Sequence, residues 1–161
     1  MRKVTEKDNY KLIAKLLNES FSAVAEEFNI TRENCPSHNA FIEWETLYNK
    51  MNSNTEFYLL ESSGYFIGFI AIEKSKKEKG TFYIEKVAIH PDYRHKGKGK
   101  QIMEFAEKRI KELDGKRISV GLINENVRLK DWYKSLGYSE TGVKVFGHLP
   151  FDVCYMGKEL K

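Results

Sequence analysis

The segment from Val87 to Gly99, which reads VAIHPDYRHKGKG, constrains the fold of this chain more than any other. It begins as an apolar strand, stops at Pro91 and becomes a basic loop with two glycines. The amphipathic stretch Lys98–Leu113 that follows predicts a helix. A strand that enters a helix through such a turn presents unpaired backbone N–H groups and the positive end of the helix dipole. The segment therefore favours binding of a pyrophosphate or another polyanion.

The spacing of the glycines excludes two nucleotide-binding motifs. A dinucleotide fingerprint that starts at Gly97 and Gly99 requires a third glycine where the chain has Ile102. A P-loop requires Ser or Thr after Gly-Lys, whereas Gly99-Lys100 is followed by Gln101. The loop either binds an anion in another way or is a solvated charged turn.

Size and composition fit a single domain over residues 1–161. The 161 residues are 41% hydrophobic and 13% aromatic, which is enough to bury a core. No run reaches the roughly 18 apolar residues of a membrane span, and no apolar stretch of a secretory signal follows the charged N-terminus. We expect a cytoplasmic protein, a monomer or a homodimer, with its two cysteines reduced.

Net charge and ligand patterns argue against nucleic acid and metal. The 27 basic and 23 acidic residues give a net charge of +4, which is too small to indicate a nucleic-acid partner by itself. Cys35-x-x-His38 is an isolated pair, and His90, His95 and His148 form no ligand-like cluster. We expect no metal.

Hydrophobic periodicity predicts an α+β domain with a mixed sheet. Helices are expected from a cap at Thr5 or Asp8 to Val24, over Phe41–Met51, over Lys98–Leu113 with Gly115 as C-cap, and over Val127–Leu136. Strands are expected over 2–5, Glu56–Glu61, Tyr65–Lys74, Phe82–His90, Arg117–Ile123, Tyr138–Phe146 and Val153–Glu159. The turn Ser62-Ser63-Gly64 joins two of these strands as a hairpin.

Two motifs resemble the GNAT acetyltransferase superfamily. Arg94-x-x-Gly97-x-Gly99 after a strand resembles its acetyl-CoA motif, and Asn126-(x6)-Tyr133 followed by KSLGY resembles its downstream motif. The terminal VCYMGKEL resembles the last strand of the family, so the resemblance covers essentially the whole chain. It implies the GNAT fold, an α+β (three-layer) arrangement in which about four helices flank a mixed, mostly antiparallel sheet of six to seven strands.

The resemblance implies acetyl-CoA as co-substrate. The strand Val87–Ile89 would offer main-chain groups to the pantetheine arm, in a slot where the following strands splay apart. The pyrophosphate would lie on the backbone amides of His95–Lys100. The expected cofactor-binding residues are Val87, Ala88, Ile89, Arg94, His95, Lys96, Gly97, Lys98, Gly99, Lys100, Asn126 and Tyr133.

The resemblance also implies direct acetyl transfer in a ternary complex, with Tyr133 as general acid to the CoA sulfur; a core tyrosine is the alternative. Glu85 is the candidate base. The two-residue period of a strand puts Glu85, Val87 and Ile89 on one face, where apolar neighbours would raise the pKa of the carboxyl. The alternatives are an ion pair with a neighbouring lysine, or Tyr83 acting through a water.

The acceptor is expected to be an amine of a small molecule. The family branch that acetylates ribosomal protein N-termini has a glutamate five residues before the motif asparagine, where this chain has Gly121. Five glutamates make the N-terminal region acidic, which suits a cationic amine. They are Glu26, Glu27, Glu33, Glu43 and Glu45. Candidate walls are Phe28, Trp44 and Gly147–Phe151, although residues of these kinds are more often plain surface or core positions.

Three other functions remain open. The first is a protein or peptide N-acetyltransferase, and the second is an acyl-CoA-binding sensor without turnover. The third is a nucleic-acid-binding domain that uses the basic loop. It predicts aromatic residues between the cations, and only Tyr93 fits.

Overall fold

One seven-stranded sheet runs through the molecule in the order β1-β2-β3-β4-β5-β7-β6. The structure, a computed structural model, describes residues 1–51 and 53–161. Its strands are β1 (Arg2–Lys3), β2 (Thr55–Ser62), β3 (Tyr65–Lys74), β4 (Thr81–Ile89), β5 (Arg117–Ile123), β6 (Ser139–Lys144) and β7 (Val153–Glu159). Among the described strands, β4 and β5 alone pair in parallel. The predicted α+β class with a mixed, mostly antiparallel sheet is confirmed.

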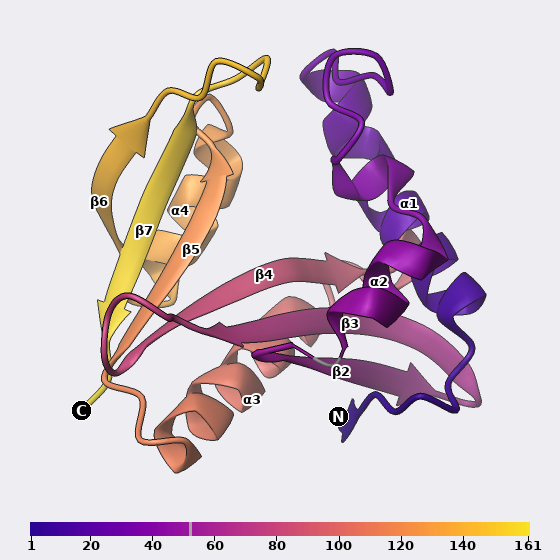
Figure 1. Cartoon of the computed structure of the whole chain (residues 1–161), viewed down its shortest axis with the longest axis horizontal. Helices are drawn as coiled ribbons and strands as arrows, with labels where there is room; N and C mark the ends of the chain where they lie inside the picture. The colour runs from indigo at the N-terminus through magenta and orange to yellow at the C-terminus, as the bar shows by residue number, and fades with distance from the viewer. Residues whose placement is uncertain (52) are drawn as a thin grey trace.

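Helices cover the two faces of this sheet unequally (Figure 1). They are α1 (Tyr10–Glu27), α2 (Trp44–Lys50), α3 (Lys98–Glu112) and α4 (Val127–Ser135), with short 3₁₀ turns η1 (Asn39–Phe41) and η2 (Pro91–Tyr93). One core cluster joins α3 and α4 to one face, through side chains such as Ile102, Ile110 and Tyr133. A second cluster joins α1 and α2 to the other face of the β1–β4 arm only. The matching face of β5-β7-β6 is therefore free to line a groove.

The first helix begins one residue later than predicted. Asn9 is the N-cap of α1, and its side chain accepts a hydrogen bond from the N–H of Leu12 at 3.2 Å. The predicted caps Thr5 and Asp8 are wrong, because the Asp8 carboxylate is bound by the Arg2 guanidinium (2.6 Å) and by the N–H of Thr5. The ion pair with Arg2, six residues earlier in the chain, therefore removes Asp8 as a cap.

Two other helix ends differ from the prediction. Helix α2 starts at Trp44 and not at Phe41, because Ile42 is extended between it and η1. At the end of α3 the left-handed residue is Asp114 (φ 60°), while the N–H of Gly115 returns to the carbonyl of Ile110 at 2.8 Å. Gly115 is needed for close approach, since a Cβ there would overlap Ile110.

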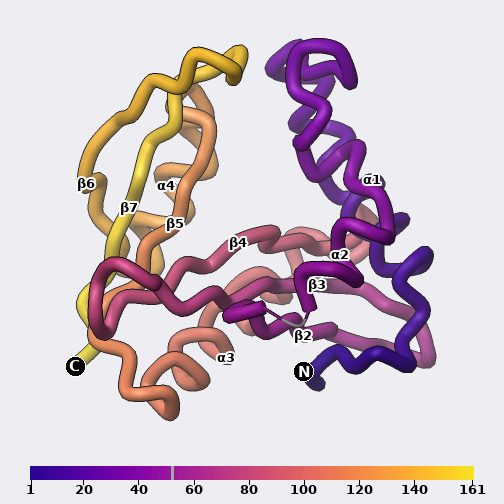
Figure 2. The backbone as a smooth tube through the Cα atoms, viewed as in Figure 1, coloured from indigo at the N-terminus to yellow at the C-terminus, as the bar shows by residue number. Residues whose placement is uncertain are grey.

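The sheet divides into two arms between β4 and β5. These strands pair only from Thr81–Ile84 to Arg117–Val120 and then diverge, as Figures 1 and 2 show. The C-terminal end of α1 meets the far end of β5 in a third apolar cluster. In this cluster Ala25 and Ile30 lie with Ile123. The diverging strands therefore border a slot that is closed at its far end.

Candidate active site

The loop between β4 and α3 leaves a row of backbone donors free. Gly97 is the N-cap of the 15-residue helix α3 with φ +73°, and His95 also has a positive φ of 58°. The N–H of Gln101 is the first to bond back, to the carbonyl of Gly97 at 3.0 Å. Within residues 1–51 and 53–161, the N–H groups of residues 95–100 donate to no protein acceptor. They converge with the helix dipole on an anion site.

Most cations of this loop are only lightly engaged. Lys96 donates to the carbonyl of Asp92 at 3.0 Å, and Lys98 approaches Gln101 at 3.5 Å. Lys100 pairs with the exposed Glu104 at 3.7 Å, and His95 is exposed. Such exposed contacts are weak, so these side chains are available to phosphate groups.

Arg94 differs from these residues. Its Nε donates to the carbonyl of Ile89 at 3.2 Å, and its Nη2 donates to the carbonyl of Ser20 in α1. The guanidinium predicted to bind the cofactor is already engaged in holding the end of β4 against α1. Its contact with a phosphate stays a prediction.

A β-bulge interrupts β4 beside the slot. Phe69 of β3 lies opposite Ala88, and Ala71 lies opposite Glu85, so one residue of β3 faces two residues of β4. Lys86 in this bulge has φ 55°, a conformation that costs a non-glycine residue of the order of 1–2 kcal/mol. No glycine or asparagine in the sequence marks the position.

From Val87 onward, the bulge reverses the face of the sheet on which each side chain of β4 lies. Ala88 packs in the cluster of α1 and α2, and Glu85 lies opposite Ala71 of the same cluster. Val87 and Ile89 pack against the cluster of α3. The prediction that Glu85 shares a face with Val87 and Ile89 is wrong, because one extra residue shifts the alternation.

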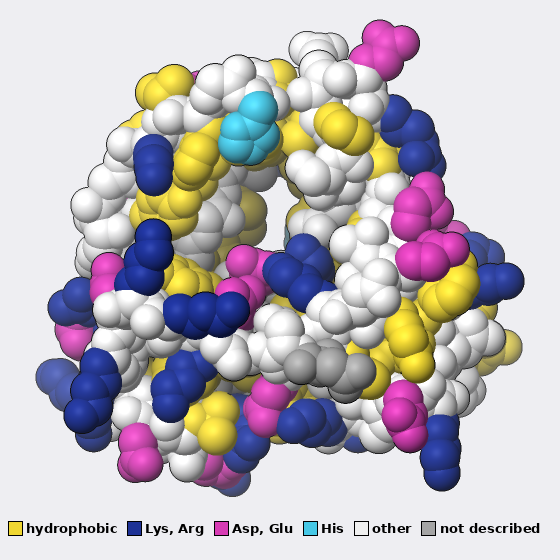
Figure 3. Space-filling model, in the orientation of Figure 1, with side chains coloured by type: hydrophobic (Ala, Val, Ile, Leu, Met, Phe, Trp, Pro, Cys, Tyr) yellow, Lys and Arg dark blue, Asp and Glu magenta, His cyan; other side chains and the backbone are white. Residues whose placement is uncertain are grey.

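Charged groups surround Glu85 in place of the predicted apolar ones. Its Oε2 lies 3.3 Å from Nζ of Lys50 and 3.9 Å from Nζ of Lys86, which confirms the ion-pair alternative. Glu85 is the first residue of β4 beyond its pairing with β5. It lines a groove of about 1000 Å³ that runs over β5, β7 and β6 past Tyr83 and Tyr155. Figure 3 shows a hollow between the arms with basic and acidic side chains adjacent at its lower edge.

Tyr133 is buried and its hydroxyl stays protonated. It lies on α4 with 5% of its surface exposed, packed at 4.9 Å from the ring of Trp132 and 5.6 Å from that of Tyr138. Burial raises the pKa of its hydroxyl well above the usual range, so the group stays protonated. No described residue forms a hydrogen bond with this hydroxyl. The role of Tyr133 as general acid stays a prediction.

The two motifs meet where α4 touches the start of α3. A Cβ on Gly99 would lie 3.0 Å from Cζ2 of Trp132, so this glycine is required for close packing. Asn126, predicted to contact the cofactor, is the N-cap of α4 and accepts from the N–H of Leu129 at 3.2 Å. Sequence reasoning missed Trp132, since no motif spacing marks its contact with Gly99.

Part of the expected acidic character is neutralised on the acceptor side. Glu27 pairs with Arg128 at 2.6 Å, and Glu43 pairs with Arg32 at 3.3 Å. Gly121 carries no carboxylate and lies beside the ring of Tyr155. Within the described residues, no three His, Cys, Asp or Glu side chains are grouped to hold a metal ion.

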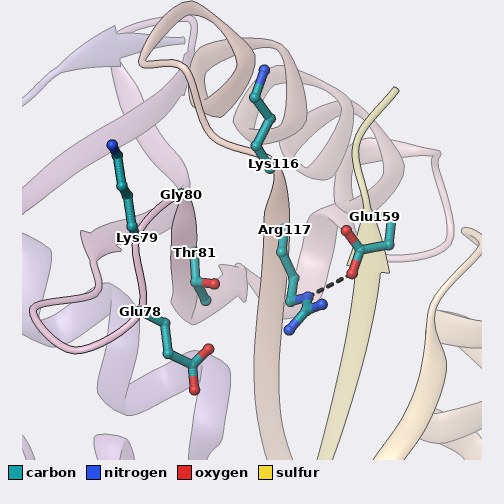
Figure 4. A pocket seen from close by; sticks show the side chains of 7 residues that line it. All are labelled: Glu78, Lys79, Gly80, Thr81, Lys116, Arg117 and Glu159. Carbon is teal, nitrogen blue, oxygen red and sulfur yellow. Dashed lines mark hydrogen bonds and ion pairs between the residues drawn. The ribbon is translucent and has the colours of Figure 1, made fainter.

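A second, shallow pocket of about 270 Å³ lies at the paired end of β4 and β5 (Figure 4). Arg117 and Glu159 form a hydrogen-bonded ion pair at 2.5 Å across its floor. This pocket shares Glu78, Thr81, Arg117 and Glu159 with the larger groove, so it forms the end of that groove at the paired part of β4 and β5. In the described part of the chain, no helix is both long and apolar enough to cross a membrane.

The sequence matches the family model described as the acetyltransferase (GNAT) family over residues 12–138. An uncharacterized N-acetyltransferase of Lactobacillus delbrueckii subsp. lactis is 26% identical over 95 residues, which are 56% of this chain and 55% of that protein. The chain therefore matches about half the length of this curated relative.

Solved structures share the fold. A GNAT-family protein from Desulfovibrio desulfuricans superposes with a TM-score of 0.76 at 16% identity, covering 99% of this chain and 98% of its own. A GNAT-family acetyltransferase from Elizabethkingia anophelis with acetyl-CoA bound gives a TM-score of 0.60 at 18% identity, covering 72% of this chain and 83% of its own.

Proposed function

The chain belongs to the acetyltransferase (GNAT) family, and from that premise we propose that it transfers the acetyl group of acetyl-CoA to a primary amine of a small molecule. The transfer is direct, in a ternary complex. The observation that carries the proposal is the row of free N–H groups over residues 95–100, placed beside the opening between β4 and β5. We treat residues 1–161 as one functional domain.

The residues present fit CoA. Gly97 holds the left-handed conformation that turns the loop into α3, and a Cβ there would meet no atom within 4 Å, so the space above it is open. The free amides, the exposed Lys96 and Lys100 and the half-buried Lys98 suit phosphate groups. The unpaired edge of β4 from Val87 to Ile89 suits an amide-containing arm. The acetyl-CoA bound to the Elizabethkingia relative supports this assignment.

Each catalytic task has a candidate group. When bound, acetyl-CoA supplies a thioester carbonyl and a thiol leaving group. The backbone N–H at the bulge near Val87 donates to the developing oxyanion. Glu85 removes a proton from the amine, and the Tyr133 hydroxyl returns a proton to the departing sulfur. Neither Cys35 nor Cys154 is required, and both are buried.

Thermal unfolding with CoA, acetyl-CoA and generic DNA tests the cofactor assignment. Either form of CoA at about 100 times its Kd should raise the Tm by about 5 °C or more, because it binds only the folded state. DNA should leave the Tm unchanged. An unchanged Tm with both forms of CoA contradicts the proposal. Release of free thiol from acetyl-CoA with a panel of amines then tests turnover, and separates an enzyme from a sensor.

A further inference from the structure

We propose that the acceptor is a primary alkylammonium ion, and that Lys50 occupies its binding position between Glu73 and Glu85 until the acceptor displaces it. The inference rests on the proposed function, because it names the substrate class of the same site. It also assigns Glu73 as a residue that determines specificity.

The geometry places one ammonium group between two carboxylates. Nζ of Lys50 lies 3.7 Å from Oε2 of Glu73 and 3.3 Å from Oε2 of Glu85. The two glutamates belong to the adjacent strands β3 and β4, and both line the groove. The carboxylate proposed as the base is therefore already in contact with an alkylammonium group of the chain itself.

The cluster is neutral while Lys50 is in place and carries one unmatched negative charge once Lys50 leaves. Glu73 and Glu85 contribute two negative charges, and Lys50 and Lys86 contribute two positive charges. Lys86 is held by the bulge, and 14% of its side chain is exposed. When Lys50 leaves, one negative charge is unmatched, and a single acceptor ammonium restores neutrality. A neutral arylamine does not.

Lys50 is placed to leave at little cost. It is the last residue of the short helix α2, with 38% of its side chain exposed. Exposed ion pairs are screened by water, and losing one changes an equilibrium constant by at most about fivefold. The acceptor position is therefore occupied only weakly by the chain.

The groove admits an unbranched chain behind the ammonium. Beyond Glu85 it passes the small residues Ser119, Thr141 and Gly157, none of which projects far above the sheet. No helix covers this face of β5-β7-β6. A flexible alkyl chain can lie along this surface while its amine stays beside Glu85.

Steady-state rates with n-butylamine, 1,5-diaminopentane and the neutral arylamine aniline test the inference. The wild-type protein should use both alkylamines and discriminate against aniline by at least about tenfold in kcat/KM. Lys50→Met should lower the KM for n-butylamine by up to about fivefold. Glu73→Gln should raise that KM by up to about fivefold with kcat nearly unchanged, since Glu73 contacts the ammonium without taking its proton. Lys15→Met removes another lysine–glutamate ion pair, with Glu19 at 3.8 Å and more exposed than the pairs of Lys50, and should change neither constant.

Three results overturn the inference: equal use of aniline, an unchanged or raised KM in Lys50→Met, or an unchanged KM in Glu73→Gln. Calorimetric binding of acetyl-CoA to each variant, which should match the wild type, shows that the variants are folded. Loss of acetyl-CoA binding by the wild type itself would refute the proposed function. Efficient turnover of aniline with acetyl-CoA bound would refute only the alkylammonium inference.

Discussion

The cofactor side and the acceptor side of the candidate site consist of different parts of the chain. The cofactor side consists of backbone, with the N–H groups of residues 95–100 and the unpaired edge of β4 beyond Ile84. The acceptor side consists of side chains, with Glu73, Glu85 and Lys50 brought together from two strands and a helix. Backbone geometry is fixed by glycines and turns, whereas side-chain chemistry changes with single substitutions. In the proposed function, the first side specifies the cofactor and the second the acceptor.

The largest expected effect breaks the backbone side. Gly97→Val should weaken CoA binding at least 100-fold by calorimetry, because a β-branched residue does not tolerate φ +73° and the loop cannot keep its shape. Gly64→Val is the matched control, since Gly64 has φ +80° in the open hairpin turn between β2 and β3, outside the loop. It should lower stability and leave CoA affinity unchanged. Equal affinity in Gly97→Val would remove the loop as the phosphate site.

The next effect separates proton donation from binding. Tyr133→Phe should reduce kcat about 100-fold with CoA affinity nearly unchanged, because the hydroxyl acts only as sulfur departs. Tyr138→Phe is the control. Tyr138 is also buried in the same cluster, but its hydroxyl bonds Glu107 at 3.3 Å. Full activity of Tyr133→Phe in the thiol-release assay would leave Tyr133 as a core residue only.

The smallest effect concerns the ion pair that joins α3 to β2, away from both sides of the site. Arg109 of α3 holds the carboxylate of Glu56 with two 3.0 Å hydrogen bonds, and these, with Lys3 and Tyr58, lower the pKa of Glu56 from 4.5 to about 2. A lowered pKa stabilises the fold above pH 4.5, and this stabilisation is lost as the pH falls through 2. Glu56→Gln should therefore cost about 1 kcal/mol at pH 6 and progressively less below pH 4.5, measured by urea unfolding. A cost that does not depend on pH would show that the charge is not responsible.

The sequence predicted the parts of the fold that depend on local pattern. The strands Tyr65–Lys74, Arg117–Ile123 and Val153–Glu159 have the predicted bounds, because each is an apolar run between clear turn signals. The glycine loop and the start of α3 at Lys98 were predicted for the same reason. The local sequence determines the bounds of these elements, and the elements that pack against them do not change those bounds.

Features that depend on distant partners were not predictable. The bulge at Lys86 has no residue that favours a positive φ, so the alternation of β4 was read without it. The guanidinium of Arg94 reaches α1, 74 residues away in sequence. The contact of Trp132 with Gly99 likewise exists only once α4 and α3 have packed.

The single inserted residue in β4 has a consequence for how such a protein can diverge. Because of it, Glu85 faces one side of the strand and Val87 and Ile89 face the other, although the three residues alternate along the chain with one residue between each and the next. Substitutions at the face of Glu85 can then alter the preferred amine while the neighbouring main chain keeps its hold on the common donor. In the proposed function, the preference for the amine can therefore change in evolution without a change in the binding of acetyl-CoA.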